Sequence, residues 1–461
     1  MLLGNGCRAS GGVSVEGNTA WLLTSAALVL LMTPGLAFFY GGMVRTKSVL
    51  NMLMMCFGAM AVVGVLWVVF GYSIAFGDDV AGGLFGDVSQ FIGLSGLLGA
   101  DTLTGTGFVA FQGMFAIITV ALIAGAIADR ARFGAWLVFC ALWATLVYFP
   151  IAHWVFDFSN DSGHVGGWIA NDLVALDFAG GTAVHINAGA AALALVIVLG
   201  RRAGWPREPM KPHNLPFVML GAGLLWFGWF GFNAGSALAA NELAGVAFIN
   251  TFTATCAAIL GWLLIERIRD GHATSLGAAS GVVAGLVAIT PACAFVDIWG
   301  ALAIGAIAGA VCALAVSIKY RFGYDDSLDV VGVHLVGGLV GTLLIGLFGT
   351  VAVNDGGADG LFYGGGLAQL GKQAVGAGAV LAYSLVATLI IGYLIKVTIG
   401  FRVDREAEVN GIDEAEHAES AYELSGLRSG GSSISRAADT LAGKVTAVSS
   451  PATTSKERLT P

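Results

Sequence analysis

Two histidines lie inside long apolar runs of the sequence, and they are the residues whose surroundings most clearly indicate chemistry. His185 lies in the run DFAGGTAVHINAGAAALALVIVLG (residues 177–200), eight residues after the aspartate that opens it. His334 lies in a second run, DVVGVHLVGGLVGTLLIGLFG (residues 329–349), which also opens with an aspartate. An imidazole can both donate and accept a hydrogen bond. An ionisable group in such a segment indicates a functional site.

The composition excludes a water-soluble fold. Of the 461 residues, 57% are hydrophobic and 11% are charged, and the mean hydropathy is +0.82. Soluble domains carry about 25% charged residues, whereas a run of about 20 apolar residues crosses a bilayer as a helix. We therefore expect an all-α, multi-pass protein of the cell (plasma or inner) membrane. Its eleven predicted spans are residues 20–44, 49–76, 107–128, 133–154, 178–199, 216–238, 244–265, 276–295, 298–318, 330–353 and 376–399.

The distribution of charge predicts the orientation. Lysines and arginines concentrate in alternate loops, near residues 45–47, 130–132, 201–211, 267–269 and 319–321. Basic loops face the cytoplasm, so the N-terminus is expected outside and the C-terminus inside. The predicted parts are an extracytoplasmic segment (1–19), a transmembrane domain (20–400), a charged regulatory tail (401–426) and a Ser/Thr/Gly/Ala-rich, disordered tail (427–461).

The positions of the two histidines suggest an internal repeat. His185 lies in the fifth predicted span and His334 in the tenth. Because five is odd, a second group of five spans runs in the opposite direction. Spans one to five and six to ten then form an inverted repeat, with one span added. Such repeats are typical of transporters and place the working site near the middle of the membrane, where we expect the two histidines to meet.

Paired imidazoles in an apolar site can share one proton, and low dielectric resists two positive charges there. Such a pair could hydrogen-bond a small molecule or relay a proton. A single membrane histidine can also simply bond to a neighbouring helix, for less than about 2 kcal/mol. A metal site is disfavoured because no third ligand stands out. The six cysteines form no CxxC motif and are interpreted as packing residues, and the net charge of −8 indicates no nucleic-acid partner.

Further candidates are an aspartate and several aromatic residues. Asp177 precedes its span, where it can cap the helix or attract a cation arriving at the outer mouth. Phe111 and Phe115 lie one turn apart, as do Phe232 and Ser236. Phenylalanines in membrane helices usually pack or face lipid, but aromatic faces can also hold a cation. Both interpretations stay open at this point.

Eight motifs occur in order along the chain: FYGGMVR, AFQGMFA, PIAH, DFAGGTAVHINAGAAAL, KPHNLP, GWFGFNAGSALAANE, TPACAF and DVVGVH. Together they resemble the ammonium transporter (Amt/Rh) family, in particular its Amt branch, over about residues 20–425. The resemblance implies a homotrimer of eleven-helix subunits, each with its own narrow hydrophobic pore. Because the sequence shows no nucleophile–base or metal constellation, we expect no enzymatic activity, no metal and no cofactor.

The same resemblance assigns roles to individual residues. His185 and His334 match the twin histidines of the pore, and Phe115 and Phe232 match two stacked rings that block it from outside. Phe115, Ser236 and Asp177 match the outer ammonium recruitment site. Three further residues match the vicinity of the pore, namely Tyr40, Phe111 and Gln112.

One position departs from the family pattern. The outer site usually includes a tryptophan shortly after PIAH, where this chain has Phe156, and Trp154 lies two residues earlier. Either ring could form the wall of the site. Because phenylalanine is a poorer cation–π partner than tryptophan, we expect lower ammonium affinity than in a homologue with tryptophan.

The function implied by the resemblance is ammonium recruitment and deprotonation, followed by conduction of ammonia past the twin histidines. Two alternatives stay open: an electroneutral ammonia gas channel, and a nitrogen sensor that signals through a P-II-type partner. The tail segment GIDEAEHAESAYELSG (residues 411–426) resembles the family's cytoplasmic element. In bacterial and archaeal members this region receives a trimeric P-II protein that plugs the pore, although the tail could also serve only to stabilise the trimer.

Overall fold

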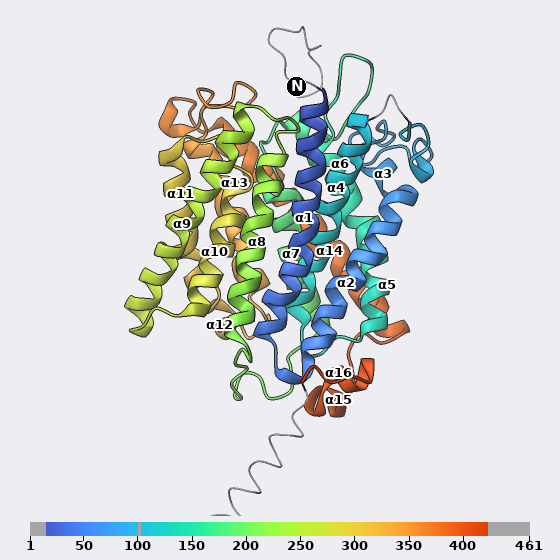
Figure 1. Ribbon diagram of the computed structural model, residues 1–461, viewed down its shortest axis with the longest axis vertical. Helices are drawn as coiled ribbons and strands as arrows, with labels where there is room; N and C mark the ends of the chain where they lie inside the picture. The colour runs from blue at the N-terminus through green and yellow to red at the C-terminus, as the bar shows by residue number, and fades with distance from the viewer. Residues whose placement is uncertain (1–14, 100–102, 423–461) are drawn as a thin grey trace, which may run out of the picture. The chain divides into compact units, whose positions relative to one another are not determined.

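The structure, a computed structural model, describes residues 15–99 and 103–422 and is helical throughout its long elements (Figure 1). Ten helical segments in this part of the chain are long and apolar enough to cross a membrane, and one further apolar helix has 15 residues. This agrees with the all-helical, multi-pass fold expected from the composition. Residues 1–14 and the tail predicted for 427–461 lie outside the described residues.

The helices follow the chain in the order of the predicted spans. The longer ones are α1 (Val15–Met43), α2 (Val49–Leu66), α4 (Leu103–Ile123), α5 (Phe133–Trp143), α6 (Phe149–Phe156), α7 (Asn187–Leu199), α8 (Leu215–Gly235), α9 (Glu242–Asp270), α10 (Ser275–Ile289), α11 (Ile298–Ala315), α13 (Val336–Phe348) and α14 (Ala368–Thr398). The short ones are α3 (Tyr72–Phe76), α12 (Ile318–Phe322), α15 (Arg405–Asn410) and α16 (Ile412–His417). Segments of π-helix join several of them: η2 (Trp67–Gly71), η6 (Ala144–Tyr148), η8 (Gly181–Ile186) and η9 (Val331–Leu335).

Two predicted span boundaries were wrong. The span expected at 276–295 ends as a helix at Ile289, two residues before Pro291, which has no backbone N–H to continue the helical hydrogen bonds. The last span starts at Ala368 rather than 376. Gln369 and Gln373 make its first turns polar in sequence, yet both side chains are buried against the protein and do not face lipid.

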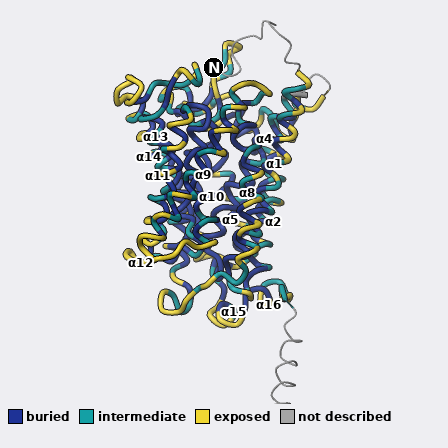
Figure 2. Tube along the Cα trace, turned by 60° about the vertical axis from the view of Figure 1, so that its left-hand side comes forward, coloured by how far each residue is buried: buried dark blue, intermediate teal, exposed yellow. Residues whose placement is uncertain are grey.

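The buried residues lie on the inside of the helical bundle, and exposed residues lie on its outer surface and at its two ends (Figure 2). α1 packs along α8, α9 packs against α10 and α11, and α14 packs against α7. Two contacts are reciprocal: α7 packs on η9, and α13 packs on η8. This reciprocity agrees with an inverted repeat in which the two histidine-bearing segments are equivalent.

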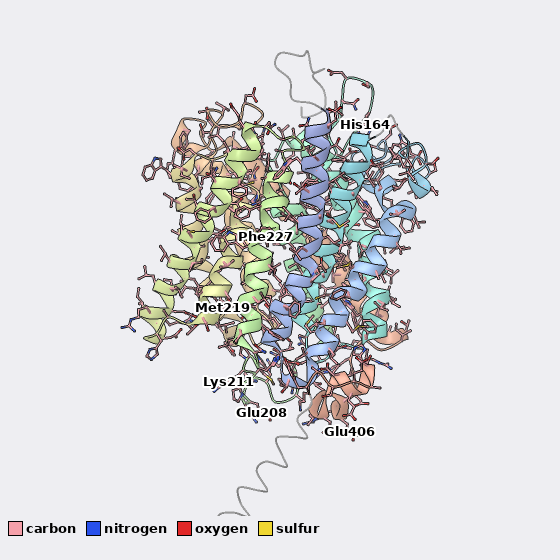
Figure 3. All side chains as sticks on the ribbon, in the orientation of Figure 1. His164, Glu208, Lys211, Met219, Phe227 and Glu406 are labelled. Carbon is pink, nitrogen blue, oxygen red and sulfur yellow. The ribbon has the colours of Figure 1, made fainter. Side chains whose placement is uncertain are left out.

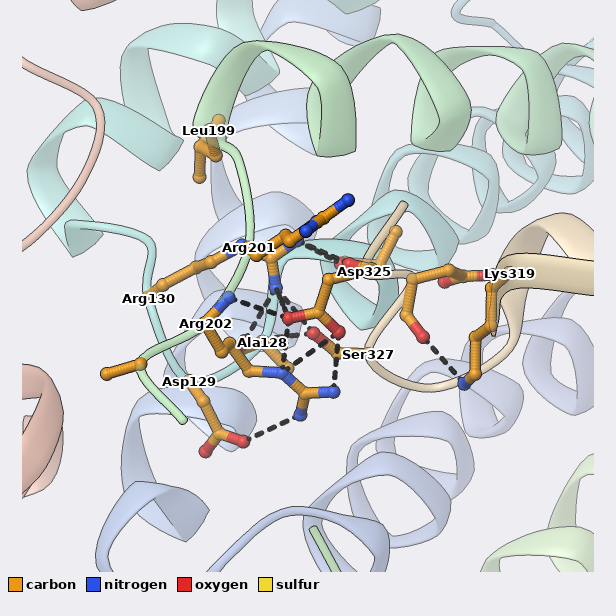
Figure 4. A network of polar contacts seen from close by, with 12 residues as sticks. Ala128, Asp129, Arg130, Leu199, Arg201, Arg202, Lys319, Asp325 and Ser327 are labelled. Atoms are coloured by element: carbon orange, nitrogen blue, oxygen red, sulfur yellow. Dashed lines mark hydrogen bonds and ion pairs between the residues drawn. The ribbon is translucent and has the colours of Figure 1, made fainter. Parts of the chain in front are cut away.

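At one end of the bundle, which we call the basic end, a network of ion pairs joins three loops (Figure 4). The buried Arg202 guanidinium contacts Asp325 at 2.8 Å and Asp129 at 3.1 Å. Arg130, also fully buried, donates to the Asp325 carbonyl oxygen and to Ser327, both at 2.6 Å. Because removing one partner of a buried ion pair leaves an uncompensated charge, this network fixes the three loops relative to one another.

The described part of the tail docks at the same basic end. Asp413 accepts hydrogen bonds from the backbone N–H groups of Leu50 and Asn51 at 3.0 and 2.8 Å, and Glu416 accepts one from Phe133 at 2.9 Å. These N–H groups lie in the first turns of α2 and α5, where a helix lacks internal partners and its dipole favours negative charge. Carboxylates of the tail therefore cap two helices of the bundle.

At the opposite end, which we call the acidic end, His164 joins two loops (Figure 3 labels its position). Its Nδ1 lies 2.6 Å from an Asp78 oxygen, and its Nε2 lies 2.9 Å from an Asp157 oxygen. The hydrogen bond with Asp157 is the main reason that the pKa of His164 rises to about 9, and the interaction with Asp78 adds to it. His164 is therefore charged at neutral pH and connects the loop after α3 to the loop after α6.

We predict that replacing His164 with glutamine lowers the melting temperature in a pH-dependent way. The pKa of His164 is about 9 in the folded protein and about 6.5 in the unfolded chain. Its ion pairs therefore stabilise the fold fully below about pH 6.5, and this stabilisation is lost as the pH rises through about 9. The melting temperatures of wild type and H164Q in detergent should therefore differ most near pH 6 and converge near pH 10. H272Q, at an exposed loop histidine, is the control. An equal difference at both pH values would contradict the prediction.

Candidate functional site

Both candidate histidines lie in π-helical segments rather than in regular α-helix. His185 is part of η8 and His334 is part of η9, and each segment leads directly into α7 or α13. A π-helical turn contains an extra residue and shifts the side chains that follow, and such turns occur frequently at functional sites. None of the sequence patterns above marks this local geometry.

The two imidazoles are in direct contact, as expected from the repeat. The Nδ1 atoms of His185 and His334 lie 3.2 Å apart, and the rings are nearly parallel, at 21°. The residues are 1% and 3% exposed. One of the two nitrogens must carry the hydrogen of this bond. The neutral pair therefore presents one bare Nε2 and one Nε2–H. The Nε2 of His185 has no hydrogen-bond partner among the described residues, so this nitrogen is available to a small molecule.

A narrow cavity runs beside the histidine pair. Apart from the two imidazoles its walls are apolar or aromatic and include Ile118, Val184 and Leu225. It has room for roughly one molecule of the size of water. The histidines are thus the polar groups of an otherwise apolar cavity.

Close helix packing brings the rings together. A Cβ atom on Gly189 of α7 would lie 2.5 Å from the backbone nitrogen of Leu335, next to His334. A Cβ atom on Gly338 of α13 would lie 3.2 Å from the Cβ of His185. Each histidine-bearing segment therefore faces a glycine of the other, and a larger residue at Gly189 would push the segments apart.

The two predicted gate rings are stacked. Phe115 of α4 and Phe232 of α8 have ring centroids 4.0 Å apart at an interplanar angle of 18°, and both are buried. Phe111 packs edge-on against Phe115 at 4.9 Å. Because Phe232 also lines the cavity and lies 6.1 Å from the His185 ring, the stacked pair closes the cavity from one side.

The structure distinguishes between the two candidate aromatic walls. The Phe156 ring meets Phe115 edge-on, with centroids 6.4 Å apart, and is partly exposed. The Trp154 indole donates to the Leu84 carbonyl oxygen at 2.7 Å and packs on Trp168. Phe156 therefore borders the gate, and Trp154 supports the neighbouring loop.

Asp177 caps the segment that carries His185. Its two carboxylate oxygens accept hydrogen bonds at 2.7 to 3.3 Å from four successive backbone N–H groups, those of Gly180, Gly181, Thr182 and Ala183. This is the capping role that the sequence left open. Ser236 is partly exposed and donates to the Phe232 carbonyl oxygen at 2.8 Å, which leaves its oxygen free to accept a hydrogen bond.

Both apolar runs open with an aspartate in the sequence, but Asp329 is not the structural counterpart of Asp177. The equivalent residue is Asp326, which also precedes its histidine by eight residues and accepts from the N–H groups of Val330 and Val331 at 3.1 and 2.8 Å. Asp329 instead pairs with Lys319 at 2.6 Å. Burial raises the pKa of Asp326 above its usual range. The aspartate that caps the His334 segment therefore lies three residues before the one that opens the apolar run.

All three residues assigned to the pore vicinity, including Phe111, are buried, and none of them lines the cavity. The Tyr40 hydroxyl donates to the Leu122 carbonyl oxygen at 3.0 Å. Gln112 lies between Phe111 and Phe115 on α4 and is 9% exposed. Both lie next to residues of the cavity or the gate, so their assignment as neighbours of the pore stays a prediction.

The sequence reasoning missed Trp229. Its indole stacks on the His185 ring with centroids 5.3 Å apart at 16°, and its Nε1 donates to the Thr290 hydroxyl at 2.8 Å. It also lines the cavity. The signal that could have revealed it is its position three residues before Phe232, on the same face of α8.

Comparison with known proteins identifies relatives along most of the chain. The sequence profile of the Ammonium Transporter Family matches residues 20–422. The chain is 64% identical to an ammonium transporter of Mycobacterium tuberculosis, over 90% of this chain and 91% of that protein. It is 47% identical to an ammonium transporter of Bacillus subtilis, over 88% of this chain and 98% of that protein.

The fold agrees with these sequence matches. The crystal structure of Saccharomyces cerevisiae Mep2 superposes with a TM-score of 0.78 at 36% identity, covering 85% of this chain and 88% of Mep2. A structure described as a sensor Amt protein superposes with a TM-score of 0.80 at 28% identity, covering 88% of this chain and 99% of that one. The chain therefore belongs to the Ammonium Transporter Family and is a multi-pass integral membrane protein.

Proposed function

We propose that this protein transports ammonium across the cell membrane by conducting it as neutral ammonia through the cavity beside His185 and His334. The observation that carries the proposal is the 3.2 Å contact between two buried imidazoles in an apolar cavity of molecular size. The named relatives are ammonium transporters. The basic end faces the cytoplasm by the positive-inside rule, so the gate and Phe156 face outside.

The outer site recruits the cation. Phe115 and Phe156 provide aromatic faces, Ser236 provides a hydroxyl oxygen, and Asp177 contributes negative charge near the outer mouth. An aromatic face attracts a cation through its quadrupole. The Asp177 carboxylate already accepts four N–H groups. It therefore acts on the arriving cation through its charge and through the backbone it holds.

The apolar cavity requires the substrate to lose its charge. Moving a bare cation from water into a medium of low dielectric costs tens of kcal/mol in Born estimates, and the walls beyond the gate offer no carboxylate. Ammonia, in contrast, has about the size of water and can both donate and accept hydrogen bonds. It can accept from the Nε2–H of one imidazole and donate to the bare Nε2 of the other, and the proton released outside can cross separately through the pair.

We predict that H185A and H334A each reduce ammonium transport by about tenfold or more. Each variant removes a hydrogen bond of about 1–2 kcal/mol from the path, and about 1.4 kcal/mol corresponds to a factor of ten in rate. The measurement is the current evoked by an ammonium pulse on proteoliposomes, together with internal pH. H153A, at a buried histidine outside the cavity, is the control.

The outcomes distinguish three functions: transport with net charge transfer, an electroneutral gas channel and a sensor. Current that decays faster at higher protein density shows net charge transfer. A pH change without current supports the gas channel, and neither signal in wild type supports a sensor. Normal transport by both histidine variants, with intact assembly, would contradict the proposed path.

We also predict that F156W lowers the half-saturating ammonium concentration. Tryptophan is the better cation–π partner, and about 0.5–1 kcal/mol corresponds to a two- to fivefold change. W154F is the matched control, because Trp154 contacts the neighbouring loop and not the gate. An unchanged or higher half-saturating concentration in F156W would show that Phe156 does not weaken the site.

The oligomer and the partner are part of the same proposal. We infer a homotrimer, testable by the mass of the detergent-solubilised protein. We also infer that a trimeric P-II-class protein binds the basic end, where the tail caps α2 and α5 through Asp413 and Glu416.

For the tail we predict that deleting residues 401–461 weakens co-purification of a P-II protein. Truncation after Glu419, the last residue of the unit that contains the helical bundle, should leave it unchanged because the capping carboxylates remain. Transport by each truncated protein is measured in parallel as the control for folding. Full binding after the longer deletion would exclude a role of the tail in docking. The tail would then serve only to stabilise the trimer.

A further inference from the structure

The last membrane-spanning helix of the described residues, α14, carries a buried amide whose contacts none of the roles above explains. The side chain of Gln373 is fully buried. Its Nε2 donates to the carbonyl oxygen of Leu176 at 2.7 Å and to that of Thr342 at 3.1 Å. Its Oε1 accepts from the backbone N–H of Leu176 at 2.6 Å and from Gln369 at 2.9 Å. The amide thus donates two hydrogen bonds and accepts two.

Leu176 is the residue immediately before Asp177. It lies in a non-helical stretch between Leu173 and Gly181, so helical hydrogen bonds do not satisfy its backbone. The Gln373 amide pairs with both its N–H and its C=O, as a neighbouring strand would. In a membrane protein, water cannot replace such partners for buried backbone groups. Gln373 therefore determines where this segment of backbone lies.

The residue on the other side of Asp177 is fixed as well. The backbone N–H of Phe178 donates to the Pro291 carbonyl oxygen at 3.1 Å. Asp177 is thus held between two anchored neighbours, one bound to α14 and one to the turn after α10. Because its carboxylate caps the segment that carries His185, a shift of Leu176 would move the carboxylate and loosen the start of that segment.

The contact with Thr342 adds a second connection. Thr342 belongs to α13, the helix that continues from the segment of His334. One amide on α14 therefore touches the entry of the His185 segment and the helix of His334 at the same time. α14 is the span outside the two predicted repeats, and Gln373 is the side chain through which it bonds to both.

We propose that Gln373 is a positioning residue for ammonium recruitment: it fixes Asp177 through the backbone of Leu176 and ties that position to α13. This inference rests on the proposed role of Asp177 in the outer site. Gln373 itself does not touch the substrate. Its loss should therefore weaken recruitment and leave the path past the histidines intact.

The test compares two variants of Gln373 with a control on the same helix. Q373E keeps the size and the acceptor for the Leu176 N–H but loses both donated bonds, and Q373M removes all four bonds at similar length. T388V is the control, because Thr388 is also buried on α14 and its loss leaves the Trp143 indole without its acceptor. All three variants thus break a buried hydrogen bond between α14 and the bundle.

The expected result is a split between the two kinetic parameters. The half-saturating ammonium concentration should rise by about fivefold or more in Q373E and Q373M, while the maximal rate stays within about twofold. T388V should have the same half-saturating ammonium concentration as wild type. Its melting temperature should nevertheless be lowered, as in the Gln373 variants. The readout is the ammonium-evoked current in proteoliposomes, with assembly and melting temperature measured in detergent.

Two outcomes would overturn the inference. Wild-type half-saturation in both Gln373 variants would show that Asp177 does not depend on this amide. Loss of assembly in both, or the same kinetic change in T388V, would assign Gln373 a purely structural role. Failure of the proposed function is distinct from these outcomes, because wild type itself would then show no ammonium-dependent flux.

Discussion

A hydrogen bond between two buried imidazoles requires two helices to approach closely in a place where no other group competes for the ring nitrogens. The bond between His185 and His334 joins residues that are 149 positions apart. It depends on Gly189 and Gly338, because a Cβ atom at either position would press on the opposite segment. Trp229 completes the arrangement by stacking on one ring. The apolar lining of the cavity leaves the two imidazoles without competing polar side chains among its lining residues.

The two histidine segments begin within the protein, so their first N–H groups need partners there. Asp177 and Asp326 supply them, each eight residues before its histidine. The supports of these aspartates differ at the two ends. Leu176, before Asp177, is held by a neutral amide from the apolar helix α14, whereas Asp325, before Asp326, is held by the guanidinium of Arg202. An amide adds no charge within a membrane span, whereas a guanidinium can pair with the carboxylates of the basic loops.

The gate has a mechanical consequence for transport. Stacked rings with centroids 4.0 Å apart leave no space between them, so a molecule can pass Phe115 and Phe232 only when the rings move apart. Phe156 lies edge-on beside the stack and is partly exposed. In the proposed function, recruitment on the outer face and entry into the cavity are therefore separate steps. The first would depend on cation–π attraction and the second on ring motion and loss of charge.

The sequence by itself predicted the long apolar helices, ten of which in the described residues are long enough to cross a membrane, because hydropathy is a local property that length and composition reveal. It also identified His185, His334, Phe115 and Phe232 through motifs whose residues are neighbours in the chain. It misjudged Gln369 and Gln373, since polar residues at the start of a span look like a loop until the partners that bury them are known. It showed Asp177 and Asp329 at the openings of the two apolar runs but not the capping role of Asp326, because the opening of an apolar run is visible in sequence and a backbone cap is not. Only the tertiary structure decided that Asp326 is the second cap, that Phe156 lies edge-on to Phe115, that Trp229 stacks on His185, and that Gln373 bonds to the backbone of Leu176. These facts depend on contacts between helices far apart in the chain, and such contacts are fixed by close packing rather than by local composition.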